Sequence, residues 1–287
     1  MVAWRTADLK TLKSNPEVRV VEAVSNRVIY LHLDSGRDQT PFALDNEGKP
    51  LPKNPLKDRR VRLAMSKAIN RQAIVDRVME GAAIPAGQLL PEGFFGVSPN
   101  LKPEPFDPNG AKKLLAEAGY PEGFRLTLHS PNDRYVNDEK VAQAVAQMLN
   151  RVGIKTEVVA MPQSVYFSRA SKLEFSFMLV GWGAETGEPS SPLKSLLATN
   201  DPAKGFGAAN RGRFSDPRLD GLLVQALATV DDGKRKLLLQ QATEVGIGDV
   251  GIIPLHYEVT VWGMRSDLTF VGNTNQYTLA PDVHPAK

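Results

Sequence analysis

The region from residue 124 to residue 180 alternates two kinds of apolar pattern, and this alternation restricts the fold more than any other feature of the sequence. Three short apolar runs favour strands, and the two intervals between them favour helices. The expected strands cover residues 124–129, 154–160 and 175–180, and the expected helices cover residues 141–152 and 163–171. Such a succession predicts parallel strands joined by right-handed crossovers. We therefore expect an α/β fold.

Polar and aromatic residues follow the first and the third of these strands. The first loop, SPNDRYVN, covers residues 130–137, and the second, GWGAETGEPSSP, covers residues 181–192. Ligands of parallel α/β sheets bind outside the carboxyl ends of the strands, so we expect both loops to face the same crevice. This convergence indicates a binding site.

The second loop contains the residues best suited to hold an amine-bearing ligand. Gly181, Trp182 and Gly183 end the strand, and Glu185 follows them. The carboxylate can anchor an ammonium group, while the backbone around Trp182 can pair with an extended peptide as an added strand does. In the alternative interpretation Trp182 is an aromatic residue at the edge of the core and Glu185 is a solvated loop acid.

The first loop offers a partner for the opposite charge. The planar guanidinium of Arg134 can meet a ligand carboxylate, and Tyr135 can line a side-chain pocket. Alternatively, Arg134 is a solvated loop residue. Arg211 and Arg213 are rival partners for the same carboxylate.

The rest of the chain gives local signals. The clearest helix has Asp107 as its cap, Pro108 at its first position and Gly119 after its end. Other expected helical segments end near residue 15, begin at Asp58 and at Asn70, cover residues 193–198, begin at Pro217, and cover residues 234–245. Strands are expected over residues 18–24, 27–33, 251–258 and 260–264, with loops over residues 34–55 and 84–108 and an irregular tail from residue 268.

The composition is typical of a soluble globular protein, with 42% hydrophobic and 23% charged residues. The net charge of +3 is spread along the chain, which gives no support for binding to nucleic acid. The absence of cysteine excludes disulfides, thiolate metal sites and cysteine nucleophiles. No apolar run has the length of a membrane span, and residues 1–4 do not begin a signal peptide.

Motifs for catalysis, metals and cofactors are missing. The four histidines lack metal-ligand spacing, no phosphate-binding loop occurs, and the glycines at 205 and 207 form only part of a dinucleotide fingerprint. No G-x-S-x-G motif is present. We therefore predict a binding protein without metal or cofactor, and a hydrolase that uses the same crevice is the enzymatic alternative.

Several segments resemble a known family when they are taken together. The order G-W-x-A-acid-x-x-x-P, formed here by Gly181, Trp182, Ala184, Glu185 and Pro189, resembles the segment in which periplasmic oligopeptide- and dipeptide-binding proteins hold the α-ammonium of a peptide. Residues 60–81, 111–124 and 141–158 also look like segments of this family, in the same order. These proteins are the family 5 extracellular solute-binding proteins of ABC importers.

The resemblance implies a two-lobed fold of the type II periplasmic binding proteins, with the N-terminal part of the first lobe missing from this sequence. It places residues 1–27 at the end of a lobe I segment and the approach to the hinge, residues 28–182 in lobe II, and residues 183–287 in the C-terminal return segment of lobe I. The hinge crossings are expected near residues 24–33 and 180–183.

By resemblance the protein is a periplasmic monomer, with a signal peptide encoded upstream, that delivers a solute to the membrane permease subunits of an ABC importer. Family members take peptides, glutathione, metal chelates and other solutes, and their anchoring acid is more often aspartate than the glutamate found here. Glu185 is then the anchor for a ligand ammonium. A ligand-sensing domain of a transcription regulator is the other alternative.

Overall fold

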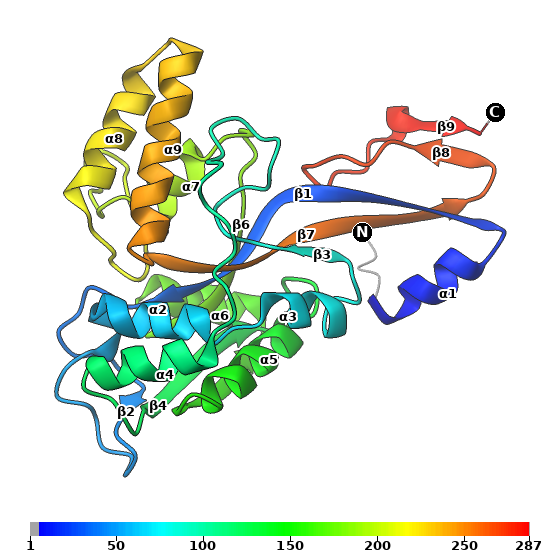
Figure 1. The fold of residues 1–287 in the computed structure, drawn as a ribbon. Helices are drawn as coiled ribbons and strands as arrows, with labels where there is room; N and C mark the ends of the chain where they lie inside the picture. Colours follow the sequence, from blue (N-terminus) through cyan, green and yellow to red (C-terminus); the bar gives the residue numbers. More distant parts are fainter. Residues whose placement is uncertain (1–5, 287) are drawn as a thin grey trace.

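One mixed sheet of seven strands organises the chain (Figure 1). The structure is a computed structural model and describes residues 6–286. The strands follow the order β2-β4-β6-β1-β7-β3, and β5 pairs with β4 outside this path. Strands β8 and β9 form a separate pair. The bounds of the strands are β1 Val18–Leu33, β2 Ala43–Leu44, β3 Ala83–Pro85, β4 Phe124–Pro131, β5 Ile154–Met161, β6 Phe177–Gly183, β7 Ile252–Arg265, β8 Leu268–Phe270 and β9 Val283–Pro285.

Helices cover both faces of the sheet. Their bounds are α1 Leu9–Ser14, α2 Arg59–Lys67, α3 Arg71–Arg77, α4 Pro108–Glu117, α5 Asp138–Asn150, α6 Gln163–Ser171, α7 Ser190–Pro192, α8 Pro217–Ala228 and α9 Asp232–Gly248. Short 3-10 turns lie at Thr6–Asp8, Pro55–Lys57 and Ala280–Asp282, and Leu193–Leu197 is a π-helical turn. In Figure 1 helices α2 to α5 lie on one side of the sheet, and α8 and α9 lie on the other.

The alternation of side chains along a strand divides the interior into two cores. Ile29, Leu31 and Leu179 point into the first core, which α2, α3, α4 and α5 cover. Val28 and Tyr30 point into the second core, which α6, α8 and α9 cover. Both cores use β1 and β6, so these two strands are the centre of the molecule.

The predicted parallel core is confirmed. Strand β4 pairs in parallel with β5 along its whole length, and with β6 through His129 and Met178. The cap of α4 is also as predicted, because an Asp107 carboxylate oxygen accepts a hydrogen bond from the Gly110 N–H at 2.8 Å. Gly119 follows that helix with φ of +92°, a conformation that glycine adopts without strain.

Two predicted strand breaks are wrong. Residues 18–24 and 27–33 belong to the single strand β1, and residues 252–265 form the single strand β7. The polar segment from Ser25 to Arg27 reads as a strand end, but the chain bulges there instead: the pairing register between β1 and β7 shifts between Val24 and Val28. The Asn26 N–H donates to the Thr274 oxygen at 2.8 Å, so the bulged backbone is still hydrogen-bonded.

Three other predictions need smaller corrections. The tail is not irregular throughout, because β8 and β9 pair antiparallel, and the loop over residues 34–55 contains the two-residue strand β2. Strand β6 begins at Phe177 and not at Phe175, since the Phe175 carbonyl accepts from Arg37 Nη2 at 2.9 Å instead of joining the ladder. Each of these depends on a partner distant in the sequence.

The helices after residue 193 share a core with strands that we assigned to lobe II. Leu219 and Leu223 of α8 and Leu239 of α9 lie in the second core with Val28 and Tyr30. The proposed division of the chain at residues 27/28 and 182/183 stays a prediction.

Candidate functional site

The two predicted loops meet at the end of β6. The Tyr135 hydroxyl donates a hydrogen bond to the Gly181 carbonyl oxygen at 3.2 Å. A Cβ atom at position 181 would lie 2.7 Å from a Tyr135 ring carbon and 2.7 Å from Ile29 Cδ1, so only glycine lets the tyrosine ring lie over the strand. Burial raises the pKa of Tyr135. Tyr135 is therefore a neutral, hydrogen-bonded wall.

The first loop is held in place by a buried carboxylate. Asp138 Oδ2 accepts hydrogen bonds from the N–H groups of Arg134 and Tyr135, each at 3.0 Å. Burial raises the pKa of Asp138, while these backbone donors act in the opposite direction. The Arg134 side chain is exposed, and its guanidinium carbon lies 5.2 Å from the centroid of the Tyr135 ring. Within residues 6–286 no carboxylate forms an ion pair with Arg134, so its guanidinium remains available to a ligand.

On the edge of β6 that faces away from β1, tyrosine hydroxyls occupy two carbonyls, and Gly183 is the position left free. The carbonyls of Leu179 and Gly181 accept hydrogen bonds from the hydroxyls of Tyr166 and Tyr135, whereas the Ala184 N–H donates to the Asn26 oxygen on the β1 side at 3.1 Å. Since backbone groups alternate along a strand, Gly183 turns its N–H and carbonyl away from β1, like Leu179 and Gly181. This edge can accept an extended chain.

Glu185 is the second residue after the end of β6 at Gly183. Asn26 holds Ala184 from both sides, because Asn26 Nδ2 also donates to the Ala184 oxygen at 3.2 Å. Glu185 itself is exposed, and its carboxylate makes no hydrogen bond or ion pair with any residue in the range 6–286. By contrast, the nearby Glu188 is bound to Arg235 of α9 in a half-buried ion pair. Of the two acids in the loop, only Glu185 is free to meet a ligand.

Trp182 lies on the opposite face of β6 from Tyr135. It pairs with Val28 in the register between β1 and β6, and its ring packs against the second core. The indole Nε1 is buried and has no hydrogen-bond partner in the described part of the chain. Trp182 therefore lies at the edge of the core, as in the alternative interpretation of the sequence. Its indole N–H remains an unused hydrogen-bond donor.

A charged cluster next to Gly183 was missed by the sequence analysis. Arg27 Nε lies 3.3 Å from Glu258 Oε2 and donates to Gln276 Oε1 at 3.0 Å, and Gln276 Nε2 donates to Glu258 at 2.9 Å. Arg27 pairs with Gly183 in the strand register, so the cluster borders the free edge of β6. Arg27 and Glu258 each interrupt an apolar strand pattern. These two interruptions were the only sign of the cluster in the sequence.

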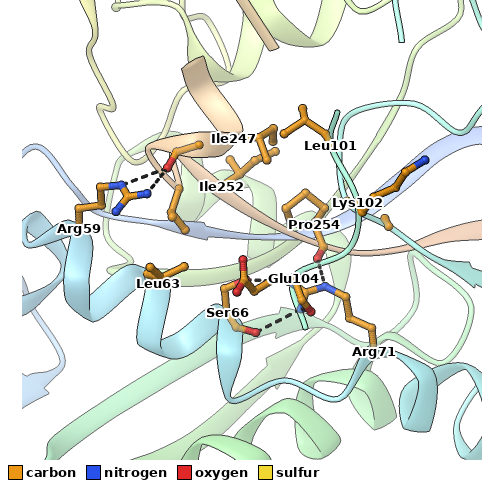
Figure 2. A pocket seen from close by; sticks show the side chains of 14 residues that line it. Arg59, Leu63, Ser66, Arg71, Leu101, Lys102, Glu104, Ile247, Ile252 and Pro254 are labelled. Atoms are coloured by element: carbon orange, nitrogen blue, oxygen red, sulfur yellow. Dashed lines mark hydrogen bonds between the residues drawn. The ribbon is translucent and has the colours of Figure 1, made fainter. Parts of the chain in front are cut away.

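A pocket lies away from the two loops, and arginines that make structural contacts line it. Its volume is about 170 Å³, and it lies between α2, the segment 86–104 and the start of β7 (Figure 2). The buried Arg71 guanidinium donates to the Pro254 oxygen at 2.7 Å and to Ser66 Oγ at 2.8 Å, and burial lowers its pKa to about 10. Arg59 likewise donates to the Gly248 oxygen at 3.0 Å. Both guanidinium groups thus donate to oxygens of the protein itself and make structural contacts.

The described residues were also compared with the requirements of a metal site and of a membrane-spanning helix. Among residues 6–286 no group of three or more histidine, aspartate or glutamate side chains is arranged to hold a metal ion. The described helices include none that is both long and apolar enough to cross a bilayer.

Comparison with known proteins identifies the family. The sequence profile of the bacterial extracellular solute-binding proteins, family 5 Middle, matches residues 1–204. The chain belongs to this family. It is 34% identical over 277 residues to the glutathione-binding protein GsiB of Escherichia coli (strain K12), covering 93% of this chain and 49% of that protein. It is 32% identical over 266 residues to di/tripeptide-binding protein 1 of Pseudomonas aeruginosa (strain UCBPP-PA14), covering 91% and 45%.

Similar solved structures confirm the fold. HbpA2 from Haemophilus parasuis superposes with a TM-score of 0.80 at 25% identity, covering 98% of this chain and 52% of that one. The periplasmic binding protein DppA from Helicobacter pylori, in complex with the peptide STSA, gives a TM-score of 0.81 at 23% identity and covers 99% and 52%. The family 5 chain thus spans about half the length of the relatives that it matches, in accord with the expected partial two-lobed α/β fold.

Proposed function

We propose that this family 5 chain binds a small solute that bears a free amine, most simply a short peptide, between two lobes. The free carboxylate of Glu185 next to the open edge of β6 is the observation that carries this proposal. An ammonium group would meet Glu185, and the peptide backbone would pair with Gly183 as an added strand. Two relatives are named for ligands of this class, glutathione and di/tripeptides.

The same site explains how a mixed set of peptides could be accepted. Main-chain pairing along β6 does not depend on the ligand side chains, and Tyr135 and Trp182 line opposite faces of the strand. Arg134 would meet a ligand carboxylate at the mouth of the site, where it has no ion-pair partner within residues 6–286. Anchors for an ammonium group and a carboxylate support binding of a solute as the role of this site.

The lobes would close around the solute, and the closed protein would be the form that membrane permease subunits of an ABC importer receive. In this role the protein would act in the periplasm, as a monomer. The bulge of β1 at residues 25–27 is the place in the structure where such a closing motion would bend the chain.

The experiment is a calorimetric titration of the complete natural polypeptide with a mixed tripeptide pool and with the same pool after N-acetylation. Binding of the free-amine pool alone is the expected result, because acetylation removes the positive charge that Glu185 would hold. Equal binding of both pools would contradict an amine anchor. If neither pool bound, the proposal that the ligand is a peptide would be contradicted.

A further inference from the structure

A shallow hollow lies on an exposed part of the central sheet. Its volume is about 520 Å³, and it lies at the start of strands β4 and β5, beside the short strand β2. Figure 1 shows β2 and β4 at the bottom of the view, away from β8 and β9. The two candidate ligand loops follow the opposite ends of the strands, and β4 alone, from Phe124 to Pro131, is about 20–25 Å long. The hollow is therefore separate from the candidate site.

The alternation of side chains along β4 and β5 directs polar residues into this hollow. Leu126 belongs to the first core, so its neighbours Arg125 and Thr127 project from the other face of the sheet. Lys155 and Glu157 project from β5 in the same direction, because they pair with Arg125 and Thr127 in the parallel register. All four side chains line the hollow, and only Thr127 among them is half-buried instead of exposed. One face of the sheet therefore gathers several charges.

Two of these charges are positive and are direct neighbours. The register pairs Arg125 with Lys155, and adjacent strands lie about 4.8 Å apart, so a single bound anion can contact both side chains. Like charges in directly opposite positions repel each other. Neither side chain forms an ion pair or a hydrogen bond within the described residues 6–286. The two cations thus lack a counter-ion from the chain itself.

The acids of the neighbouring loop have partners of their own. Arg125 Nη1 lies beside this loop, because a Cβ atom on Gly48 would be 3.5 Å from it. Glu47 pairs with Lys49 at 2.8 Å. Asp45 Oδ1 accepts hydrogen bonds from the N–H groups of Glu47 and Lys49, each at 2.9 Å. The loop therefore forms a wall of the hollow next to Arg125 without neutralising it.

Neutral donors and one acid complete the lining. The Thr127 hydroxyl makes no hydrogen bond within residues 6–286, and Asn150 uses only its Oδ1, which accepts from the Thr156 N–H at 2.6 Å. Glu157 is the single acid among the described residues that line the hollow, and it forms no ion pair within the same range. The two cations outnumber it, so the hollow favours an anion.

We propose that the hollow between Arg125 and Lys155 is a binding site for a phosphate group. A phosphate has more oxygens and more charge than a carboxylate, so it can accept from the guanidinium, the ammonium and the Thr127 hydroxyl together. Its charge would also relieve the repulsion between the two cations. Phe42 and Leu44 line the same hollow and offer apolar contact to an organic group that carries the phosphate. The phosphate is either a free anion or the headgroup of an anionic phospholipid.

The test uses the complete natural polypeptide and two probes. The first probe is radiolabelled inorganic phosphate, measured by equilibrium dialysis at constant ionic strength. The second is a set of phosphatidylcholine vesicles with and without phosphatidylglycerol, measured by co-sedimentation. The variants are Arg125→Gln, Lys155→Gln and Glu157→Gln. Lys140→Gln is the matched control, because Lys140 is an exposed lysine on α5, which covers the opposite face of the sheet.

Arg125→Gln and Lys155→Gln should each weaken binding by roughly 5- to 10-fold, because each removes one charged donor. Glu157→Gln should tighten binding by roughly 2- to 4-fold, because it removes the acid that repels the anion. Lys140→Gln should leave binding unchanged. If these changes appear with inorganic phosphate, the ligand is a free phosphate. If they appear only with phosphatidylglycerol vesicles, the ligand is a lipid headgroup.

Three results would overturn the proposal. In the first, wild-type protein binds neither probe. In the second, Arg125→Gln and Lys155→Gln bind both probes as wild type does. In the third, Lys140→Gln weakens binding as much as Lys155→Gln, or Glu157→Gln weakens it, which would show a general charge effect or a structural one. None of these results bears on the amine anchor at Glu185, which belongs to the other end of the strands.

Discussion

The paired strands β1 and β7 have two halves that differ in their surroundings. In the inner half, residues 28–33 of β1 and 252–257 of β7 are all buried between the two cores. In the outer half, none of residues 18–24 is buried, and Trp262 is the one buried residue among residues 259–265. Figure 1 shows the outer half extending away from the helices toward α1, β8 and β9.

The two halves meet at the bulge. Ser25, Asn26 and Arg27 lie opposite Glu258 alone, and the ion pair between Arg27 and Glu258 crosses this junction. The inner half is fixed by packing on both faces, whereas the outer half has few buried contacts to resist bending. The comparison shows that one pair of strands has two roles. The inner half, after residue 27 of β1, is part of the core, and the outer half, before residue 25, extends out of it. We infer that the boundary between lobes follows this junction.

Leu31→Ala should give the largest effect. Leu31 is fully buried in the inner half, so its truncation leaves a cavity and should lower the free energy of unfolding by about 3–5 kcal/mol. Val20→Ala, in the half-buried outer half, should cost less than about 1 kcal/mol. Urea denaturation followed by circular dichroism measures both. Equal losses would show that the two halves are packed alike.

Acid should destabilise the inner half through its buried histidines. Burial lowers the pKa of His256 to about 4, below the ordinary value of about 6.5 in an unfolded chain. Below pH 6.5 the unfolded chain binds a proton that the native protein does not, so stability falls as the pH falls from 6.5 to 4, by up to about 3 kcal/mol for this residue. Above pH 6.5 the histidine contributes no pH dependence.

Replacement of His256 by Gln should therefore flatten the fall in unfolding free energy between pH 6.5 and 4. His284→Gln, at an exposed position on β9, is the matched control and should leave the slope unchanged. An identical slope in wild type and His256→Gln would contradict the neutral buried state of His256.

A smaller effect than those at Leu31 and His256 is expected at the junction. Glu258→Gln removes the charge that Arg27 faces in a largely buried position and should cost about 1–2 kcal/mol. Glu22→Gln breaks an exposed pair with Lys13 on the outer half and should cost under about 0.5 kcal/mol. If the order of these two losses were reversed in thermal denaturation, the junction would not be a fixed point of the fold.

Local chemistry made much of the fold predictable. The cap at Asp107, the helix over residues 163–171 and the parallel strands of the core all follow from periodicity and from single residues. The long strands were divided in error because Ser25, Asn26 and Arg27 read as a strand end. Their hydrogen bonds go to distant residues, for example from Asn26 to Thr274, and no local pattern contains such a partner.

The candidate site was predictable to the same extent. Topology brought Tyr135 to Gly181, as expected from parallel strands that end at one edge. The pairing of Arg27 with Glu258 and Gln276 joins residues more than 230 positions apart, so the sequence could show only that two charges interrupt strands. The difference between Glu185 and Glu188 depends on Arg235 of α9, which the loop sequence does not reveal.

The central claim is that Glu185 holds the ammonium group of the solute, and a thermodynamic cycle that combines a substitution in the protein with a modification of the ligand tests it most directly. Wild type, Glu185→Gln and the control Glu92→Gln, an exposed glutamate in a loop, are titrated with one tripeptide and with its N-acetylated form. We predict that wild type and Glu92→Gln prefer the free amine by roughly 30-fold or more, about 2 kcal/mol, and that Glu185→Gln loses this preference. The same preference for the free amine in all three proteins would contradict the claim.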